Sequence, residues 1–413
     1  MSKTNGKSLI LLSGSFPYGT GEVFLENEIP VLLENFDRVF VLPMLPVGKK
    51  RPIDDRVNVI LPAVAETSRL REFLRGLKDS MFFKEWKSTP VMPFNPKLLY
   101  LVARTLGIAR RIEHTILQTY NKHNLADGII YSYWMMQSCL GGLFAAQQLN
   151  WPAVSRTHGG DLYAERYYGA YIPWQNYKVR HLTKIFPISA NGKTYLIKNY
   201  NGSDQTITVS RLGVSDRGII NHEPGSGEQV HIASCSQVYP LKRVESILDT
   251  VTVLAQKAPS NNVRWTHIGG GPDYDKLKSS VEKLSISNLE VVLTGNIPNN
   301  KIIPLYIKNE VDVFINYSSS EGIPVSIMEA LSCGIPVYAP NVGGISEIID
   351  ETNGFLFNSN DSPESVSASI LEDLEEDRLP HKGKNARDRW EKEYHLQKNY
   401  EAFAKSLLML KTD

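Results

Sequence analysis

The sequence predicts an α/β protein built from two Rossmann-like domains. Short apolar, β-prone runs alternate with amphipathic helical stretches along both halves of the chain, a rhythm typical of parallel sheets covered by helices. The 413 residues suffice for two domains of about 200 residues each. The polar stretch 221–228, which contains Pro and Gly, is the clearest break in composition. We therefore expect a first domain over residues 1–220, a linker over 221–228 and a second domain over 229–392.

The composition is that of an ordinary soluble globular protein. Apolar residues make up 42%, charged residues 22%, and the formal net charge is +1, so no overall field favours nucleic acid. Cys139, Cys235 and Cys333 are widely spaced, which indicates buried thiols in a reducing compartment, not a disulfide framework or zinc site. The apolar run 9–12 is too short for a signal peptide, and no stretch approaches about 20 apolar residues. We therefore expect a cytoplasmic protein.

The first half begins with a strand and a glycine-containing loop. Strands are expected at 8–12, 39–42, 57–61, 128–133, 153–157, 184–188 and 206–210, and helices at about 22–34, 137–149 and 190–200. In the first loop, Gly14 and Gly19 have the spacing of a P-loop. The Lys and the Ser or Thr that should follow are absent, which excludes a Walker A site. A plain strand-to-helix turn is the alternative to a ligand-binding loop.

The second half repeats the pattern. Strands are expected at 230–234, 263–268, 289–294, 311–317 and 335–339, and helices at 244–256, from 273, and at 324–333, 361–373 and 385–410. The helix at 324–333 has Pro324 in its first turn and Gly334 as its stop, and Gly343-Gly344 is expected to open another helix. Free backbone N–H groups and the helix dipole at residue 324 favour an anion such as a phosphate.

Two carboxylates bracket the start of that helix. Glu321 lies in the preceding loop and Glu329 on the helix, and eight helical residues span roughly 12 Å. Carboxylates that act as an acid/base pair on a glycosidic bond lie about 5 to 9.5 Å apart. We therefore expect Glu321 and Glu329 to hold different parts of one long ligand. A capping acid and a surface acid are the alternative.

The combined motif resembles glycosyltransferase family four, the group 1 glycosyl transferases. It consists of Glu321-x7-Glu329, with Glu-Gly-x-Pro at 321–324 and Gly-Gly-x-x-Glu at 343–347. The resemblance covers the whole chain and is strongest from Lys242 to Glu347. It implies the GT-B fold, in which two Rossmann-like domains face a central cleft and a C-terminal helix, here 393–413, crosses back to the first domain. It also implies transfer of a sugar from a UDP- or GDP-type donor to an acceptor hydroxyl with retention.

The donor site implied by the resemblance lies in the second domain. Lys242 and Arg243 come just before a helix, where cations oppose the dipole, and Arg can grip a diphosphate with two hydrogen bonds. Many relatives carry a further Arg where this chain has Ser236. Glu329 would bind the ribose hydroxyls, and Glu321 the sugar. The segment Gly322, Ile323, Pro324, Val325 and Ser326, together with the two cations, would stabilise the leaving diphosphate without a metal.

Further residues follow from their places after strands. His158, followed by two glycines and Asp161, would lie at the sugar end, with Asp161 orienting the His or touching substrate. Gly19, Gly21 and Glu22 would face the donor pyrophosphate. Gly270 permits close backbone approach, and Gly295, Asn296 and Ile297 would border the nucleobase. Asp273-Tyr274-Asp275 has the form of a metal-binding Asp-x-Asp, but acids suit a helix's first turn and we interpret them as structural.

The segment 68–111 is unusually basic. It contains ten basic and three acidic side chains, a net charge of about +7, interleaved with Phe82, Phe83 and Trp86. This composition is typical of a basic amphipathic surface. We expect peripheral docking on an anionic membrane and a lipid-linked glycan acceptor, as in capsule, O-antigen or exopolysaccharide synthesis. A solvated helical face with a soluble glycan acceptor is the alternative.

Two other functions compete with glycosyl transfer. A nucleotide-sugar epimerase of the same fold would use the same donor site. A non-catalytic two-domain sugar-binding protein predicts an export signal and gives no reason for Lys242-Arg243 beside a helix start. An NAD dehydrogenase is disfavoured because neither half has a clean Gly-x-Gly-x-x-Gly.

Overall fold

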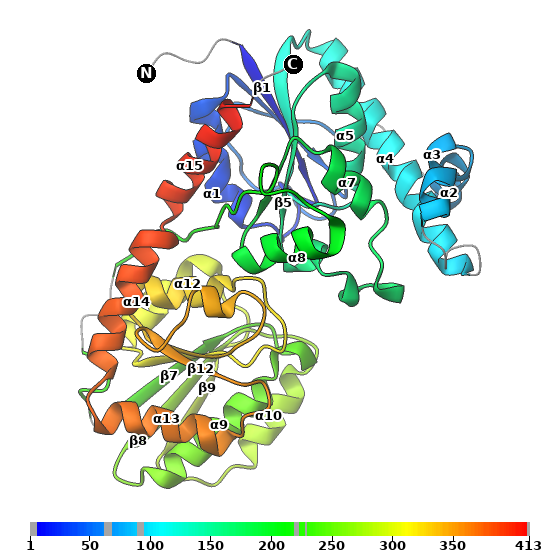
Figure 1. Ribbon diagram of the computed structural model, residues 1–413. Coiled ribbons are helices and arrows are strands. Elements are labelled where there is room, and N and C mark those ends of the chain that lie inside the picture. The colour runs from blue at the N-terminus through cyan, green and yellow to red at the C-terminus, as the bar shows by residue number, and fades with distance from the viewer. Residues whose placement is uncertain (1–5, 62–67, 89–94, 219–222, 228, 411–413) are drawn as a thin grey trace. The chain divides into compact units, whose positions relative to one another are not determined.

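The computed structural model describes residues 6–61, 68–88, 95–218, 223–227 and 229–410 (Figure 1). The chain divides into two compact units. One consists of Met1–Ser210 together with Tyr400–Asp413, and the other of Arg211–Asn399. The division falls earlier than the expected linker 221–228, and part of that linker lies outside the described residues.

The first unit is a parallel sheet with helices on both faces. Its described strands are β1 (Lys7–Ser13), β2 (Arg38–Pro43), β3 (Val57–Val59), β4 (Asp127–Ser132), β5 (Ala153–Thr157) and β6 (Lys184–Pro187). Its helices are α1 (Phe24–Asn35), α2 (Arg69–Leu77), α3 (Ser80–Ser88), α4 (Pro96–Lys122), α5 (Gln137–Leu149), α6 (Gly159–Leu162), α7 (Gln175–His181) and α8 (Ala190–Tyr200), with 3-10 turns η2 (Ala164–Arg166) and η3 (Tyr168–Ala170). The order β3-β2-β1-β4-β5-β6 is that of a Rossmann sheet.

The second unit repeats this architecture. Its described strands are β7 (Gln229–Cys235), β8 (Asn262–Ile268), β9 (Leu289–Leu293), β10 (Val313–Ile315), β11 (Val337–Pro340) and β12 (Gly354–Phe357). Its helices are α9 (Val244–Lys257), α10 (Tyr274–Glu282), α11 (Ile302–Lys308), α12 (Val325–Ser332), α13 (Pro363–Glu375) and α14 (Leu379–Glu393), with 3-10 turns η4 (Pro240–Lys242), η5 (Asn299–Lys301) and η6 (Ile345–Glu347). The order β12-β11-β10-β7-β8-β9 is the same Rossmann order, so both predicted halves are confirmed.

The strand order fixes where each unit can bind a ligand. In a doubly wound sheet, ligands bind beyond the carboxyl ends of the strands, at the point where the strand order reverses. That point lies between β1 and β4 in the first unit and between β7 and β10 in the second. The loops after β7 and β10 therefore flank the expected ligand position of the second unit.

The expected strand 206–210 and the expected unbroken helix 385–410 are wrong, and one strand was missed. Residues 206–210 form an isolated bridge between Ile207 and Ile185, not a strand. The strand β12 was not predicted. The expected helix 385–410 is broken between α14 and α15 (Leu396–Leu408), because Val214 donates to the Tyr394 carbonyl at 3.1 Å and accepts from the Leu396 amide at 3.2 Å.

The end of α15 belongs to the first unit, as the predicted fold class requires. The Phe403 ring lies 5.1 Å from the Tyr131 ring and 5.0 Å from the Phe186 ring. The guanidinium of Arg156, a fully buried side chain, lies 3.8 Å from the centre of the Phe403 ring. The end of α15 therefore packs on side chains of β4, β5 and β6 and completes the core on that side of the sheet.

Helices α2 and α3 pack against α4 at the side of the first unit (Figure 1). The approach of α2 to α4 is so close that it requires glycine. A Cβ on Gly76 would lie 1.7 Å from the Ala103 carbonyl oxygen, and one on Gly107 would lie 1.9 Å from that of Glu72. Buried Glu72 also binds the side chains of Arg104 and Arg111, at 3.3 and 3.0 Å.

Candidate functional site

Lys242 and Glu321 form an ion pair where the strand order of the second unit reverses. Lys242 ends the 3-10 turn η4 that follows β7, and Glu321 lies in the loop that follows β10. The Nζ of Lys242 donates to Oε1 of Glu321, and the two side chains are 18% and 13% exposed. Each charge therefore neutralises the other, and both can still be reached from solvent.

The loop that carries Glu321 is held from behind by two glycines. Gly343 has φ +57°, and a Cβ there would lie 1.8 Å from the Glu321 carbonyl oxygen. The amide of Gly344 donates to the Gly322 carbonyl at 2.9 Å. The glycines do not open an α-helix, as the sequence analysis expected; only the single 3-10 turn η6 follows. Their role here is close packing against the loop of Glu321.

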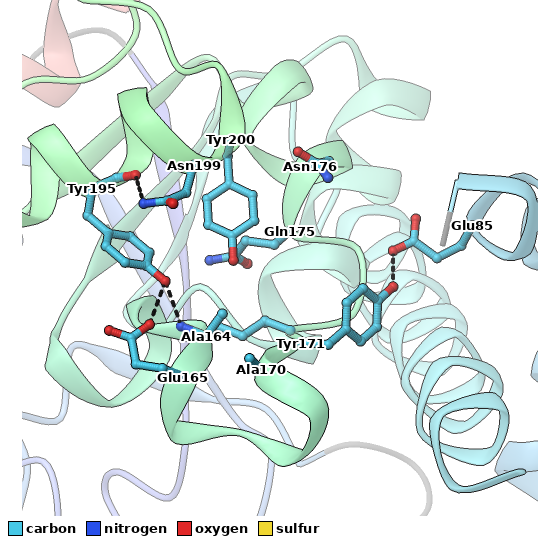
Figure 2. Close-up of a pocket in the computed structure, with 11 residues that line it drawn as sticks. Glu85, Ala164, Glu165, Ala170, Tyr171, Gln175, Asn176, Tyr195, Asn199 and Tyr200 are labelled. Carbon is cyan, nitrogen blue, oxygen red and sulfur yellow. Dashed lines mark hydrogen bonds between the residues drawn. The ribbon is translucent and has the colours of Figure 1, made fainter. Parts of the chain in front are cut away.

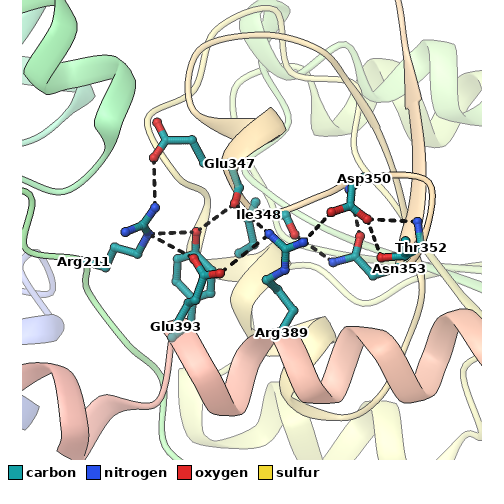
Figure 3. Close-up of polar contacts among 9 residues, drawn as sticks. Arg211, Glu347, Ile348, Asp350, Thr352, Asn353, Arg389 and Glu393 are labelled. Carbon is teal, nitrogen blue, oxygen red and sulfur yellow. Dashed lines mark hydrogen bonds and ion pairs between the residues drawn. The ribbon is translucent and has the colours of Figure 1, made fainter.

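Glu347, the last residue of the same motif, enters a polar network (Figure 3). Its Oε2 lies 3.4 Å from Nη2 of Arg211, and its carbonyl accepts from Arg389 at 3.4 Å. Arg211 and Arg389 also contact the Glu393 carboxylate, at 3.6 and 3.8 Å. The network ties the segment after the glycines to helix α14.

Glu329 lies on α12, eight residues after Glu321, and is nearly buried. Its side chain is 5% exposed, and its Oε1 accepts from Nδ2 of Asn299 at 3.1 Å. Burial raises the pKa of Glu329 to about 7, and the Asn299 hydrogen bond and the charge of Arg217 oppose this rise only partly. The carboxyl group is therefore poised between its protonated and ionised forms near neutral pH.

Arg243 and Lys242 have different partners. The backbone of Arg243 has φ +49°, and its Nη1 donates to the Ser359 carbonyl at 2.8 Å. Ser236, where relatives carry an Arg, donates its amide to the Ile268 carbonyl at 3.0 Å. Lys242 is thus the cation beside Glu321, whereas Arg243 is anchored at the loop before α13.

The loops after β8 and β9 are tied to each other. The Gly270 amide donates to Oδ1 of Asn296 at 2.8 Å, and the Gly269 amide to the Gly295 carbonyl at 3.0 Å. Gly295 has φ +65°, which glycine adopts without strain. Ile297 follows and is half-buried. The four predicted residues therefore form one connected rim, although contact with a base stays a prediction.

Asp273 and Asp275 occupy the start of α10. Asp273 is the residue before the helix, and Asp275 lies in its first turn, where acids interact favourably with the dipole. No group of three or more His, Cys, Asp or Glu side chains in the described parts of the chain is arranged to hold a metal ion. The metal-free scheme stays a prediction. Cys139 and Cys333 are buried, Cys235 is half-buried, and all three are free thiols.

In the first unit, Glu22 closes the loop after β1. Its carboxylate accepts from the amides of Gly14, Ser15 and Phe16, each at 2.7 Å. It also accepts from Nε1 of Trp134, just after β4, at 2.6 Å. Four donors therefore already occupy the carboxylate that was expected to face a ligand. Gly19, with φ +68°, and Gly21 lie in the same loop, and their contact with a pyrophosphate stays a prediction.

His158 is a buried imidazole whose ring nitrogens have no hydrogen-bond partner within the described residues. The side chain is 7% exposed, and its ring lies 4.7 Å from that of Tyr133 and 4.4 Å from that of Trp134. Burial, aided by the charge of Arg156, lowers the pKa of His158 to about 3. The ring is therefore neutral at physiological pH, and it has one N–H donor and one lone-pair acceptor that are available for hydrogen bonds. Buried polar groups without partners are uncommon in native proteins.

Asp161 holds the backbone around His158 through its carboxylate. One carboxylate oxygen accepts from the His158 amide at 2.5 Å and the other from the Met135 amide at 2.7 Å. Burial raises the pKa of Asp161 to about 7, against the effect of these hydrogen bonds and of nearby Lys178. Asp161 therefore joins the loops after β4 and β5.

Two residues of these sites were missed by the sequence analysis. Asn299 binds Glu329, and Trp134 both contacts His158 and binds Glu22. Trp134 could have been noticed, because an aromatic residue directly after a buried strand lies where α/β proteins bind ligands. Asn299 lies in a polar run, Asn-Asn at 299–300, that carries no comparable signal.

The basic segment presents a mixed surface on α2 and α3. The exposed basic residues are Arg69, Arg71, Arg75, Lys78, Lys84 and Lys87. Between them, Leu70, Leu74 and Phe83 are 62%, 44% and 53% exposed. We call these nine residues the basic apolar surface.

Other residues of the basic segment 68–111 are not exposed or not free in charge, as a membrane-binding surface would require. Phe82, one of the aromatic residues expected on the membrane-facing surface, is 1% exposed and belongs to the core, and Trp86 is half-buried. Arg110 and Arg111 are paired with Asp79 and Glu72, which reduces the free charge. None of the helices in the described part of the chain is long and apolar enough to span a bilayer.

Comparison with known proteins agrees with these motifs. Residues 219–393 match the family described as glycosyl transferases group 1. The matched segment contains Lys242, Glu321, Glu329 and Glu347, and it is similar to this family along that length. The chain is 27% identical to the sulfoquinovosyl transferase SQD2 of Arabidopsis thaliana over 61% of this chain and 51% of that protein. It is 26% identical to a putative colanic acid biosynthesis glycosyltransferase, WcaL, of Salmonella typhimurium over 52% of this chain and 53% of WcaL. The chain thus spans about half the length of these relatives.

A solved structure extends the likeness to both units of the chain. Anabaena HepE in complex with UDP-glucose covers 98% of this chain and 100% of its own, with a TM-score of 0.65 and 18% identity. At that identity the comparison bears on the fold alone. The fold is GT-B, as the sequence predicts.

Proposed function

We propose that this group 1 glycosyltransferase moves a sugar from a nucleotide-diphosphate sugar to an acceptor hydroxyl, with retention, during synthesis of a cell-surface polysaccharide. The observation that carries the proposal is the pair Lys242–Glu321, supplied by the two loops that flank the strand-order reversal of the second unit. A solved neighbour holds UDP-glucose and a relative is named for colanic acid biosynthesis, which supports a sugar nucleotide and a polysaccharide product.

The ion pair suggests how donor binding begins. Before the donor binds, Lys242 neutralises Glu321. A diphosphate brings its own negative charge, so the Lys242 ammonium pairs with the phosphates instead. The Glu321 carboxylate then becomes free to accept hydrogen bonds from sugar hydroxyls. The backbone N–H groups of Ile323, Val325 and Ser326 at the start of α12 add dipolar stabilisation. These groups bind the diphosphate most strongly as charge builds on it, which lowers the barrier.

The reaction itself requires no protein nucleophile. The bond between the anomeric carbon and the diphosphate oxygen breaks, and the acceptor oxygen bonds to the same face of that carbon. The acceptor proton passes to the departing diphosphate. Glu329 accepts from the ribose hydroxyls, and His158 offers its unspent N–H and lone pair to a sugar hydroxyl.

The test is donor turnover with and without an acceptor. Purified protein is incubated with UDP- and GDP-sugars, with and without short glycan acceptors, and products are identified by NMR. An acceptor-dependent product with the donor's anomeric configuration supports the proposal, whereas an inverted product contradicts retention. Acceptor-independent change of the sugar would identify an epimerase, and binding without turnover a sugar-binding protein.

We further propose that the protein acts at the cytoplasmic membrane face on a lipid-linked glycan. The basic apolar surface combines six cations with three exposed apolar side chains. Basic residues near an anionic bilayer contribute up to about 1 kcal/mol each, and apolar side chains such as Phe83 can insert at the interface. A soluble acceptor remains the alternative, and vesicle binding separates the two.

A further inference from the structure

The first unit contains a pocket of about 370 Å³ that the donor site does not use. Figure 2 shows it walled by the 3-10 turns η2 and η3, the start of α7, the end of α8, and Glu85 from α3. Pockets that bind small molecules range from about 300 to 1,000 Å³, so its size suits one or two sugar rings. It backs onto the His158 segment, because Nε2 of Gln175 donates to the Asp161 carbonyl at 3.4 Å.

Gln175, a residue of the pocket lining, has one buried polar atom without a partner in the described parts of the chain. Gln175 is 1% exposed, and its Oε1 has no hydrogen-bond partner within the described residues. A buried acceptor without a donor is unfavourable by about 1–3 kcal/mol.

The other walls are held in place by hydrogen bonds. The Tyr195 hydroxyl donates to Oε2 of Glu165 at 2.8 Å and accepts from the Ala164 amide at 2.9 Å. Oε1 of Glu85 accepts from the Tyr171 hydroxyl and, at 2.8 Å, from the Trp174 amide. The side chains are therefore arranged before any ligand arrives, which limits the entropy lost on binding.

The chemistry of the lining selects a class of ligand. Its side chains include Glu85, Glu165, three amides and three tyrosines, and no Lys, Arg or His is among the described residues that line it. Carboxylate and amide oxygens accept from hydroxyl groups, and tyrosine rings offer flat apolar area with a polar edge. Anions such as a nucleotide diphosphate are disfavoured by the two carboxylates.

We propose that this pocket binds a sugar residue of the acceptor glycan, either a neutral hexose or an amino sugar. The inference rests on the proposed function, since it names a subsite for the acceptor. Glu85 also places one wall on α3, whose exposed residues Phe83, Lys84 and Lys87 belong to the basic apolar surface. A glycan carried by a membrane-bound lipid would therefore meet the pocket beside the surface that holds the protein to the bilayer.

The direct test measures sugar binding without any turnover. Saturation-transfer NMR is recorded on the full chain with methyl glucoside, methyl galactoside, N-acetylglucosamine and galactosamine. Asn176 is an exposed residue of the lining, so Asn176→Trp should block the pocket without disturbing the core. Glu165→Gln removes one charge, and Glu34→Gln, an exposed carboxylate on α1, makes the same change elsewhere.

We expect transfer to at least one sugar in the wild type and in Glu34→Gln. The signal should fall at least fivefold in Asn176→Trp and weaken in Glu165→Gln, with UDP affinity unchanged in all variants. No transfer to any of the four sugars would overturn the proposal. Transfer that persists undiminished in Asn176→Trp would place the sugar elsewhere and also overturn it.

Turnover assays then separate this proposal from the proposed function. With a working acceptor, Asn176→Trp should raise the acceptor KM at least tenfold and leave the donor KM unchanged; an unchanged acceptor KM would overturn the acceptor role. If no sugar nucleotide is turned over with any acceptor while Asn176-dependent sugar binding persists, the transferase function fails and the pocket stands as a sugar site. If sugar is transferred from the donor but no sugar binds in the pocket, the transferase function stands and the pocket proposal fails.

Discussion

The Nδ2 of Asn299 lies 3.1 Å from Oε1 of Glu329 and donates a hydrogen bond to it. A neutral amide only partly offsets the loss of water around a carboxylate that is 5% exposed, and the pKa of Glu329 accordingly rises to about 7. Asn299 thus leaves the carboxyl group close to its midpoint at neutral pH. Donor binding should therefore depend on pH.

We expect the affinity for UDP-glucose to fall as the pH drops through 7. Ribose hydroxyls donate to the ionised carboxylate, so binding requires Glu329 without its proton. Because the pKa in the free protein is raised to about 7, the ionised fraction is lost below that pH, and affinity should fall about tenfold between pH 8 and pH 6. Titration calorimetry measures this, and UDP-glucose is suitable because its phosphates do not titrate in that range.

The matched control is Glu329→Gln, which keeps the shape and removes the titration. Its affinity should be weaker and independent of pH. Glu329→Ala should weaken binding at least tenfold, since a hydrogen bond to a charged group contributes about 1.5–3 kcal/mol. A folded Glu329→Ala protein with wild-type nucleotide affinity would reject the ribose role.

Lys242→Ala should lower kcat more than it weakens donor binding. Charge on the diphosphate grows as the bond breaks, and the loss of one stabilising group in a transition state costs about 2.7–4 kcal/mol, or 10²- to 10³-fold in kcat. Lys257→Ala, an exposed lysine on α9, is the control. A chelator should leave the wild-type rate unchanged. Strict dependence on a divalent ion would contradict the metal-free scheme and return attention to Asp273 and Asp275.

Glu321→Gln should have opposite effects on binding and turnover. The substitution removes the charge that neutralises Lys242, so UDP, which has no sugar, should bind a few-fold more tightly. Transfer should slow, because the sugar loses its charged acceptor. Calorimetry with UDP and steady-state kinetics measure the two effects, and weaker UDP binding in this variant would show that Glu321 does not restrain Lys242.

Gly343→Ala should disturb the site more than its backbone angle alone explains. Gly343 has φ +57°, and a new Cβ would lie 1.8 Å from the Glu321 carbonyl oxygen. Gly6 has a similar φ of +69°, and no atom lies within 4 Å of the position that a Cβ would take there, so Gly6→Ala carries the strain of about 1–2 kcal/mol without the clash. Stability to urea should fall more in Gly343→Ala than in Gly6→Ala, and UDP affinity should fall in Gly343→Ala only. Equal effects in the two variants would argue against the packing role.

The basic apolar surface should bind anionic vesicles at low salt. Co-sedimentation should require anionic lipid, weaken as salt rises, and drop when Arg69, Arg71, Arg75 and Lys78 become Gln. The control replaces four exposed lysines of the second unit, Lys276, Lys278, Lys283 and Lys308, by Gln. Phe83→Ser should reduce binding further. Absence of binding to anionic vesicles at low salt would end the membrane proposal.

The sequence predicted the sheets well, and it pointed to Lys242, Glu321 and Glu329 from local features of the chain. Lys242 and Glu321 lie in loops that follow buried strands, and Glu329 lies on a short helix whose start is marked by Pro324. These features can be recognised within a few residues of the chain. The residues that contact the site residues cannot be recognised from the local sequence, because they lie far away along the chain. Trp134 and Glu22 are 112 positions apart, and their contact depends on β1 and β4 being neighbours in the sheet.

The errors have similar physical causes. Helical propensity runs without Pro or Gly through residues 385–410, so only the contact with Val214 reveals the break at Tyr394. Phe82 and Phe83 are neighbours of the same residue type, yet Phe82 packs in the core and Phe83 is 53% exposed. That difference depends on which face of α3 meets α4, which a basic and aromatic composition does not specify.

The return of α15 to the first unit has a consequence for synthesis on the ribosome. Residues up to Ser210 emerge before the second unit, but the rings of Tyr400 and Phe403 that cover the buried Arg156 emerge after it. Domains usually fold in the order in which they are made. Here the core of the N-terminal unit is completed only after the second unit has been translated. A fragment that ends at Ser210 should therefore need chaperone protection or aggregate.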